Sequence, residues 1–160
     1  MVISIQLEAT TEDNILRALT QASRVLESSN LLLMGSTSWP DVSTVPGHYV
    51  MYWELKSKNI NGLVELDDNK VLVECCCVVE QSLNLLYRNN RTKLRSIGAL
   101  EIRVVQQGTF DSLMEFFMSQ GASASQYKTP SCINSVEALA VLESRVLTRF
   151  FSDKNPTSEL

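Results

Sequence analysis

The hydrophobic pattern changes from a two-residue period to a helical one within the first thirty residues. Between Val2 and Leu7 apolar and polar residues alternate, which is typical of a strand with one buried face. The hydroxyl and acidic residues of Thr10–Asp13 can cap a helix. Apolar residues then follow at helical spacing: Ile15, Ala18, Leu19, Ala22, Val25 and Leu26. We therefore predict a strand over 2–7 and an amphipathic helix that ends near residues 28–30.

Two more strands are predicted before the middle of the chain. Leu31–Met34 is a short apolar run, and His48–Leu55 is a longer one that contains three aromatic residues and a histidine. Between them, Gly35–Pro46 is rich in Ser, Thr, Pro and Asp, which predicts a long loop.

The second half of the chain predicts three helices and one strand. A helix starts at Asp67–Asp68 and has one apolar face. The residues of that face are Leu72, Cys75, Cys76, Val79, Leu83 and Leu86. The alternating segment 100–104 is a strand, and Gly108–Thr109 starts a helix with Phe110, Leu113, Met114 and Phe117 turned inward. Val136–Phe151 is a last helix, before a flexible tail over 153–160.

The order β-α-β-β-α-β-α-α predicts an α+β fold. We expect a ferredoxin-like β-α-β-β-α-β sandwich whose four-stranded sheet is backed by helices, with additional C-terminal helices. In such a sandwich helices cover one face of the sheet. The other face then carries Ser4, Gln6, Glu101 and Arg103, together with either His48, Val50, Tyr52 and Glu54 or their alternates. A polar face with aromatic residues suits docking to another surface.

Composition and charge narrow the function classes. The 160 residues are 44% hydrophobic and carry a net charge of −4, so a packed core is expected and a general affinity for nucleic acid or anionic membranes is not. The charge also argues against an RNA-recognition module, although such modules expose aromatic residues on a similar sheet. With no leader-like start and no apolar run of about 18 residues, we expect a soluble, cytoplasmic protein. The consecutive Cys75, Cys76 and Cys77 are expected to be reduced core residues, and no metal site is predicted.

Candidate chemistry is sparse. No Ser-His-Asp set can be argued with a single histidine, neither common Gly-rich phosphate loop is present, and no paired carboxylates stand out. Lys128 follows the small-residue segment 121–125 in a Gln-Tyr-Lys-Thr-Pro sequence, where a solvated lysine is the ordinary interpretation. Glu101 and Arg103 lie two residues apart and so share a strand face, as an ordinary surface ion pair would. These residues do not make a complete catalyst.

Several long segments resemble one known family. PGHYVMYWELK, SIGALEIRVVQQGTFDSLMEFFMSQGAS, QYKTP and VLESRVLTRFFS are similar to the C-terminal domain of the plant auxin-responsive acyl-acid amido synthetases, the Gretchen Hagen 3 family. The likeness runs from about residue 2 to residue 152, so we expect 1–152 to be the C-terminal, lid-like domain. LESSNLLL and STVPGHYV resemble the jasmonate-conjugating branch, although auxin-conjugating members share much of both.

The resemblance implies an ATP- and magnesium-dependent ligase that adenylates a plant hormone carboxylate, jasmonate or auxin, and then passes the acyl group to an amino acid. In that family the N-terminal domain holds the acid and most nucleotide contacts, and the C-terminal domain moves over them. It implies that Lys128 reaches a nucleotide phosphate, while Ser131 replaces a common arginine. His48, Tyr52, Glu101 and Arg103 become candidates for the domain interface.

Three hypotheses remain open from the sequence. The first is a part of a ligase that is inactive without its adenylating half. The second is an interaction module that docks on an intact ligase through the polar sheet face. The third is a separate domain that binds a nucleotide or a small acid.

Overall fold

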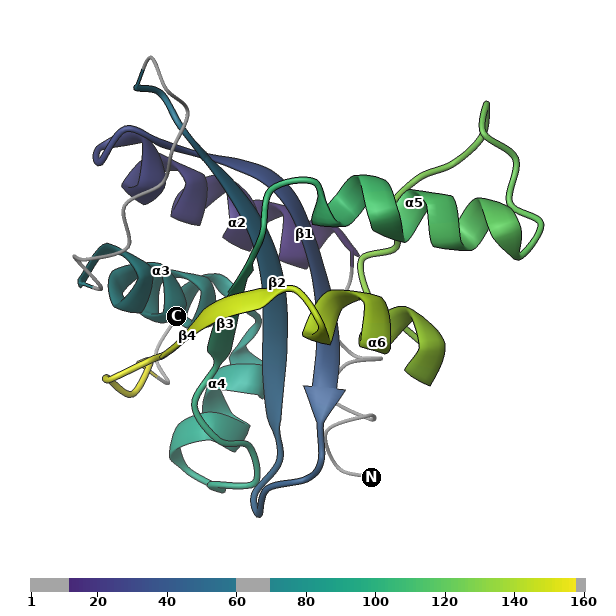
Figure 1. The fold of residues 1–160 in the computed structure, drawn as a ribbon. Coiled ribbons are helices and arrows are strands. Elements are labelled where there is room, and N and C mark those ends of the chain that lie inside the picture. Colours follow the sequence, from purple (N-terminus) through teal and green to yellow (C-terminus); the bar gives the residue numbers. More distant parts are fainter. Residues whose placement is uncertain (1–11, 60–69, 158–160) are drawn as a thin grey trace.

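The computed structural model describes residues 12–59 and 70–157. Its strands are β1 (Leu31–Asp41), β2 (His48–Ser57), β3 (Glu101–Val105) and β4 (Val146–Phe151). They form one mixed sheet in the order β1-β2-β3-β4, in which β2 and β3 are parallel and the outer pairs are antiparallel (Figure 1). The described helices are α2 (Glu12–Glu27), α3 (Lys70–Ser82), α4 (Leu85–Thr92), α5 (Thr109–Ser119) and α6 (Val136–Glu143). The predicted α+β class with a four-stranded, helix-backed sheet is confirmed.

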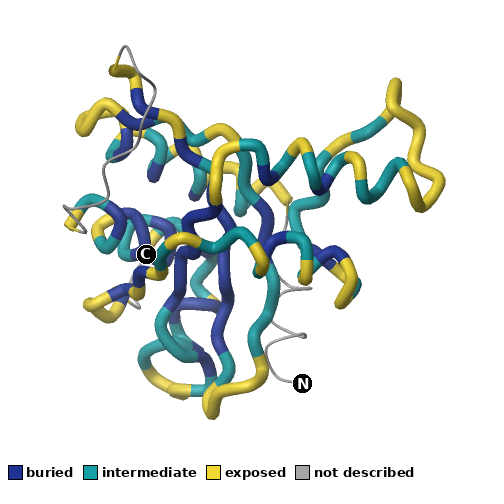
Figure 2. The backbone as a smooth tube through the Cα atoms, in the orientation of Figure 1, coloured by how far each residue is buried: buried dark blue, intermediate teal, exposed yellow. Residues whose placement is uncertain are grey.

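Each face of the sheet has its own hydrophobic core. Successive side chains of a strand point to opposite faces, so β2 sends Met51 and Trp53 to one side and Val50 and Tyr52 to the other. The first side is covered by α2, α3 and α4, and the second by α5 and α6 (Figure 1). Figure 2 shows that most of β2 and β3 is buried, as expected for central strands with helices on both faces of the sheet.

One face of the sheet was expected to be bare. That expectation is wrong where α5 and α6 cover the face that carries Val50 and Tyr52. Glu54 explains how α5 is held on this face. Its carboxylate accepts hydrogen bonds from the backbone N–H groups of Gly108 (3.1 Å) and Phe110 (2.8 Å) at the start of the helix. The Phe110 ring packs on Gly35, where an added Cβ would lie 2.7 Å from ring carbons.

Two predicted boundaries are wrong because strand pairing outweighs local composition. The segment predicted as a loop from Gly35 continues β1 to Asp41, after a register shift between Leu33 and Gly35. β1 pairs with β2 along its whole length, and the outer position of β1 in the sheet order tolerates Pro40. The last predicted helix ends at Glu143, and its second half is strand β4, which completes the sheet beside β3.

The remaining elements follow the predicted patterns more closely. α2, β2, β3 and α5 match their predicted segments, and the strand predicted over 2–7 lies outside the described residues. The helix predicted to start at 67–68 is divided, because Asn84 caps a new helix, α4. Leu86, which was predicted on the apolar face of that helix, is nearly half exposed. Of the predicted tail 153–160 the structure describes 153–157. Pro156 is buried there, and Asn155 accepts a hydrogen bond from Arg91 at 2.9 Å.

Candidate functional site

Four residues singled out by sequence lie together where β2 and β3 run side by side. Parallel pairing places Tyr52 beside Arg103 and brings the start of β2 next to Glu101. The Nε2 atom of His48 lies 2.8 Å from Oε1 of Glu101, and Arg103 donates to both oxygens of Glu101 at 2.8 and 3.0 Å. Arg103 also donates to the Tyr52 hydroxyl at 2.9 Å. The four side chains therefore form one connected polar cluster.

Three charged residues from other elements complete this cluster. Asp41, at the end of β1, accepts a hydrogen bond from Arg103 at 3.1 Å. Glu143, at the end of α6, accepts hydrogen bonds from Arg103, from the Tyr52 hydroxyl and from Arg149 of β4. Arg149 also lies 3.4 Å from Glu101. We call these seven residues the ion cluster: Asp41, His48, Tyr52, Glu101, Arg103, Glu143 and Arg149.

Burial makes the ion cluster an internal feature. His48, Tyr52, Glu101 and Arg103 are each less than a tenth exposed, whereas the Arg149 side chain is 46% exposed. Burial alone would raise the pKa of Glu101, but hydrogen bonds from His48 and Arg103 outweigh it and lower that pKa to about 2. Burial likewise opposes the charge of Arg103, and hydrogen bonding to Glu101 outweighs it, so the pKa of Arg103 is raised. Both side chains are therefore charged at neutral pH.

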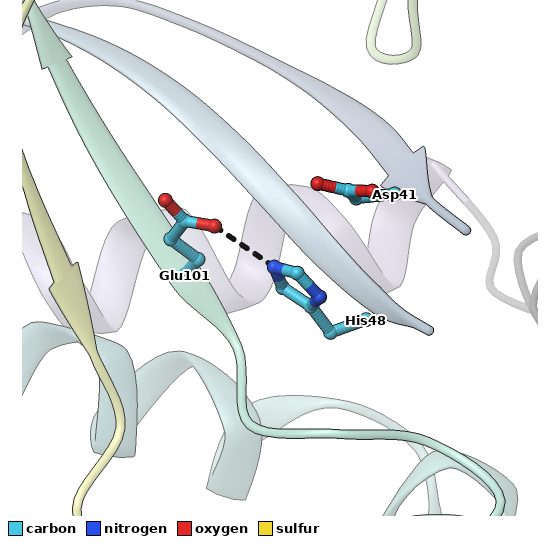
Figure 3. Close-up of side chains that lie close together, drawn as sticks. All are labelled: Asp41, His48 and Glu101. Carbon is cyan, nitrogen blue, oxygen red and sulfur yellow. Dashed lines mark hydrogen bonds and ion pairs between the residues drawn. The ribbon is translucent and has the colours of Figure 1, made fainter. Parts of the chain in front are cut away.

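The geometry of the ion cluster does not favour a metal centre. Asp41, His48 and Glu101 could each offer one ligand atom, and these atoms lie within 4.8 Å of one another (Figure 3). Arg103 already donates hydrogen bonds to both carboxylates, and its positive charge would repel a divalent cation. The Nε2 atom of His48 is also hydrogen-bonded to Glu101 (Figure 3). The arrangement is that of an ion-paired structural network.

Lys128 lies apart from the ion cluster, in the loop between α5 and α6. Its side chain is 79% exposed, and Nζ lies 2.8 Å from Oε1 of Glu12 in α2. The hydrogen bond and the charge of Glu12 raise the pKa of Lys128. The base of the loop is fixed to β1, because Thr37 donates to the Pro130 carbonyl at 2.8 Å and Ser38 to the Ser131 carbonyl at 2.6 Å. Lys128 is thus a solvated cation at a defined position.

Sequence reasoning missed the outer members of the ion cluster. Asp41 lay in a predicted loop, and Glu143 and Arg149 lay in one predicted helix. Arg149 also lacked a clear sequence signal, because Leu147 and Phe151, which share its more exposed side of β4, are apolar. Glu12 had no signal, because it lies 116 positions before its partner, Lys128.

Comparison with known proteins identifies the domain. Residues 13–137 match the model of the GH3 family C-terminal domain. The chain belongs to the GH3 family. Its GH3 relatives include the indole-3-acetic acid-amido synthetase GH3.17 of Arabidopsis thaliana, which is 50% identical over 161 residues. The 4-substituted benzoates-glutamate ligase GH3.12 of the same plant is 53% identical over 156 residues.

The GH3 relatives are much longer than this chain. The alignment with GH3.17 covers 99% of the chain and 26% of the relative, and that with GH3.12 covers 95% and 27%. A solved structure of the AtGH3.15 acyl acid amido synthetase in complex with 2,4-DB superposes with a TM-score of 0.90 at 49% identity. The superposition covers 94% of this chain and 26% of the AtGH3.15 chain. The chain thus spans about a quarter of the GH3 proteins that it matches.

Within residues 12–59 and 70–157, every helix is too short or too polar to cross a lipid bilayer.

Proposed function

We propose that this GH3 domain is the C-terminal, moving part of an ATP- and magnesium-dependent ligase that joins an amino acid to a small carboxylic acid. The observation that carries the proposal is the 50% identity to an indole-3-acetic acid-amido synthetase over nearly the whole chain. The names of the relatives favour auxin over jasmonate as the acid. The proposed partner is the family's N-terminal adenylation domain, and the proposed location is the cytoplasm, which suits four free cysteines.

The proposed reaction has two steps, because a carboxylate is a poor electrophile. The carboxylate first attacks the α-phosphate of ATP, which forms an acyl-adenylate and releases pyrophosphate. The amine of the amino acid then attacks the acyl carbon, forms the amide and releases AMP. A domain that closes over the acyl-adenylate would exclude the water that hydrolyses it.

Lys128 is the residue of this chain that we propose to contact the nucleotide phosphate. Its exposed position and its single exposed ion pair support the proposal, because an incoming phosphate can exchange with Glu12 at little cost. A flexible ammonium on a loop whose base is fixed to β1 can stabilise charge that develops on the phosphate. His48, Tyr52, Glu101 and Arg103 are too buried to meet another domain directly, so we propose that they support an interface formed by Arg149 and Phe151 beside them.

A chimera tests the proposed function. This chain replaces the matching quarter of the Arabidopsis GH3.17 protein, and pyrophosphate release and amide formation are measured with ATP, indole-3-acetic acid and an amino acid. We expect an active chimera, and a loss of about tenfold or more in the rate of pyrophosphate release with Lys128→Ala. Lys58→Ala, at another exposed lysine, is the matched control.

Two results would contradict the proposal. A folded chimera without either activity, while the parent protein is active, would show that this domain cannot serve the ligase. Pyrophosphate release by the purified 160-residue chain alone would show that the adenylating centre is in this chain.

A further inference from the structure

Basic residues are concentrated in α4 and in the loop that follows it. They are Arg88, Arg91, Lys93 and Arg95. The sequence has no acidic residue between Glu80 and Glu101, although the net charge of the whole protein is −4. Basic side chains near the C-terminal end of a helix complement its dipole, which accounts for part of this pattern. The dipole does not explain why two of these residues line the same pocket.

Arg91 and Arg95 line a pocket of about 470 Å³, a volume in the range of small-molecule sites. The other lining residues are Pro46, Thr92, Ile97, Gly98 and Asn155. Every carboxylate of the described residues is absent from this lining. α4 lies at the end of the sheet where β2 and β3 begin, whereas α5 lies at the opposite end (Figure 1). The pocket is therefore separate from Lys128, which belongs to the loop after α5.

Arg91 is held in a fixed orientation from two sides. Its Nε atom donates to Oε2 of Glu80 at 2.8 Å, and its Nη1 atom donates to Oδ1 of Asn155 at 2.9 Å. Glu80 is completely buried, and its Oε2 atom also accepts from the Tyr87 hydroxyl at 2.7 Å. Within the described part of the chain, no acceptor is bonded to Nη2 of Arg91. This end of the guanidinium is thus oriented in advance and can donate to a ligand.

Arg95 adds a positive charge that its own surroundings do not compensate. Its side chain is exposed and has no ion pair within residues 12–59 and 70–157. Its backbone φ is 52°, in the left-handed region that favours glycine. The loop is nevertheless fixed, because the N–H of Ser96 donates to the Asn90 carbonyl at 2.9 Å. Local backbone stability would favour glycine here, so it does not account for the arginine, whereas recognition of an anion would.

We propose that this pocket binds the phosphate group of a small phosphate monoester. Guanidinium groups match phosphate oxygens with pairs of donors, and the three terminal oxygens of a phosphate monoester can accept from both arginines at once. The Oδ1 atom of Asn155 is occupied by Arg91, which leaves the side-chain N–H groups of Asn155 for the same phosphate. The pocket is larger than a phosphate group, so the organic part of the ester has room beside Pro46. This site is additional to the nucleotide contact proposed for Lys128.

Binding of glycerol 3-phosphate to the 160-residue chain tests the proposal. The ester is titrated at constant ionic strength into the ¹⁵N-labelled chain to about 10 mM, tenfold above a dissociation constant of about 1 mM, while amide shifts are followed by NMR. We expect saturating shifts at residues 91–98 and at the side-chain amide of Asn155. Glycerol at the same concentration should cause none. Inorganic phosphate should compete with the ester but bind about threefold or more weakly, because it lacks the organic part.

Two neighbouring substitutions separate recognition from folding and from net charge. Arg95→Gly should weaken binding of the ester about fivefold or more. It should leave Tm unchanged or raise it, because glycine adopts a positive φ without strain. Lys93→Ala removes an equal charge from an exposed residue outside the pocket lining, so we expect a change of less than about twofold. Lys128→Ala should leave binding of the ester unchanged.

Four results would overturn the inference. They are the absence of saturating shifts at residues 91–98, equal weakening by Arg95→Gly and Lys93→Ala, loss of binding with Lys128→Ala, and tighter binding of inorganic phosphate than of the ester. The chimera assay for the proposed function does not depend on any of these results, because it measures pyrophosphate release and amide formation.

Discussion

Arg103→Met tests whether ion pairing in the ion cluster stabilises the fold. Methionine keeps an unbranched apolar side chain in the core but removes a guanidinium that donates five hydrogen bonds, to Glu101 (two), Tyr52, Asp41 and Glu143. Glu101 is only 1% exposed and would retain His48 and the more distant Arg149 as partners. Breaking a buried pair by removing one partner costs about 3–5 kcal/mol, because a buried charge is left uncompensated.

The measurement is urea and thermal denaturation of the 160-residue chain followed by circular dichroism. A loss of about 3–5 kcal/mol corresponds to a fall of about 6–20 °C in Tm for a chain of this size. Arg149→Met is the matched control within the same network. Its half-exposed guanidinium makes solvent-screened pairs, so we expect a loss of about 0–1 kcal/mol.

A double variant separates ion pairing from packing. If pairing is the cause, Arg103→Met combined with Glu101→Gln should cost at least about 1 kcal/mol less than the sum of the two single losses. Additive losses, or a loss for Arg103→Met no larger than that for Arg149→Met, would refute the reasoning.

Three further predictions concern pH and the attachment of α5. Because the pKa of Glu101 falls from 4.5 to about 2 on folding, its stabilising contribution is complete above pH 4.5 and lost as the pH falls toward 2. Urea midpoints should therefore drop over this range, and Glu101→Gln should flatten the drop. Gly35→Ala should cost about 1–3 kcal/mol because the new Cβ meets the Phe110 ring at 2.7 Å. Gly98→Ala, whose Cβ would lie 3.5 Å from its nearest neighbour, should cost less in the same denaturation assay. Glu54→Ala should cost about 0.5–2 kcal/mol, because it removes both hydrogen bonds at the start of α5. A variant with the same Tm as the wild-type chain would contradict this role.

The local sequence pattern was sufficient to predict an element whose conformation is specified by its own residues. The apolar spacing of α2 and the aromatic strand β2 were recognised because each buries a face that repeats with the period of its backbone. The second half of the last predicted helix was not recognised, because residues 146–151 become a strand by pairing with β3, more than forty positions earlier. Pairing over such a distance leaves little trace in the local composition of a segment.

The sequence by itself determined the class of the fold, the family resemblance and the residues His48, Tyr52, Glu101, Arg103 and Lys128 as candidates. Only the tertiary structure decided their surroundings. Parallel pairing of β2 with β3 placed four of them in one buried network, and α6 and β4 supplied the charges that compensate them. The fifth candidate, Lys128, is exposed to solvent and forms an ion pair with Glu12 of α2. Charges need compensation when they are removed from water, and which charges meet is decided by chain topology, which spacing along the sequence does not contain.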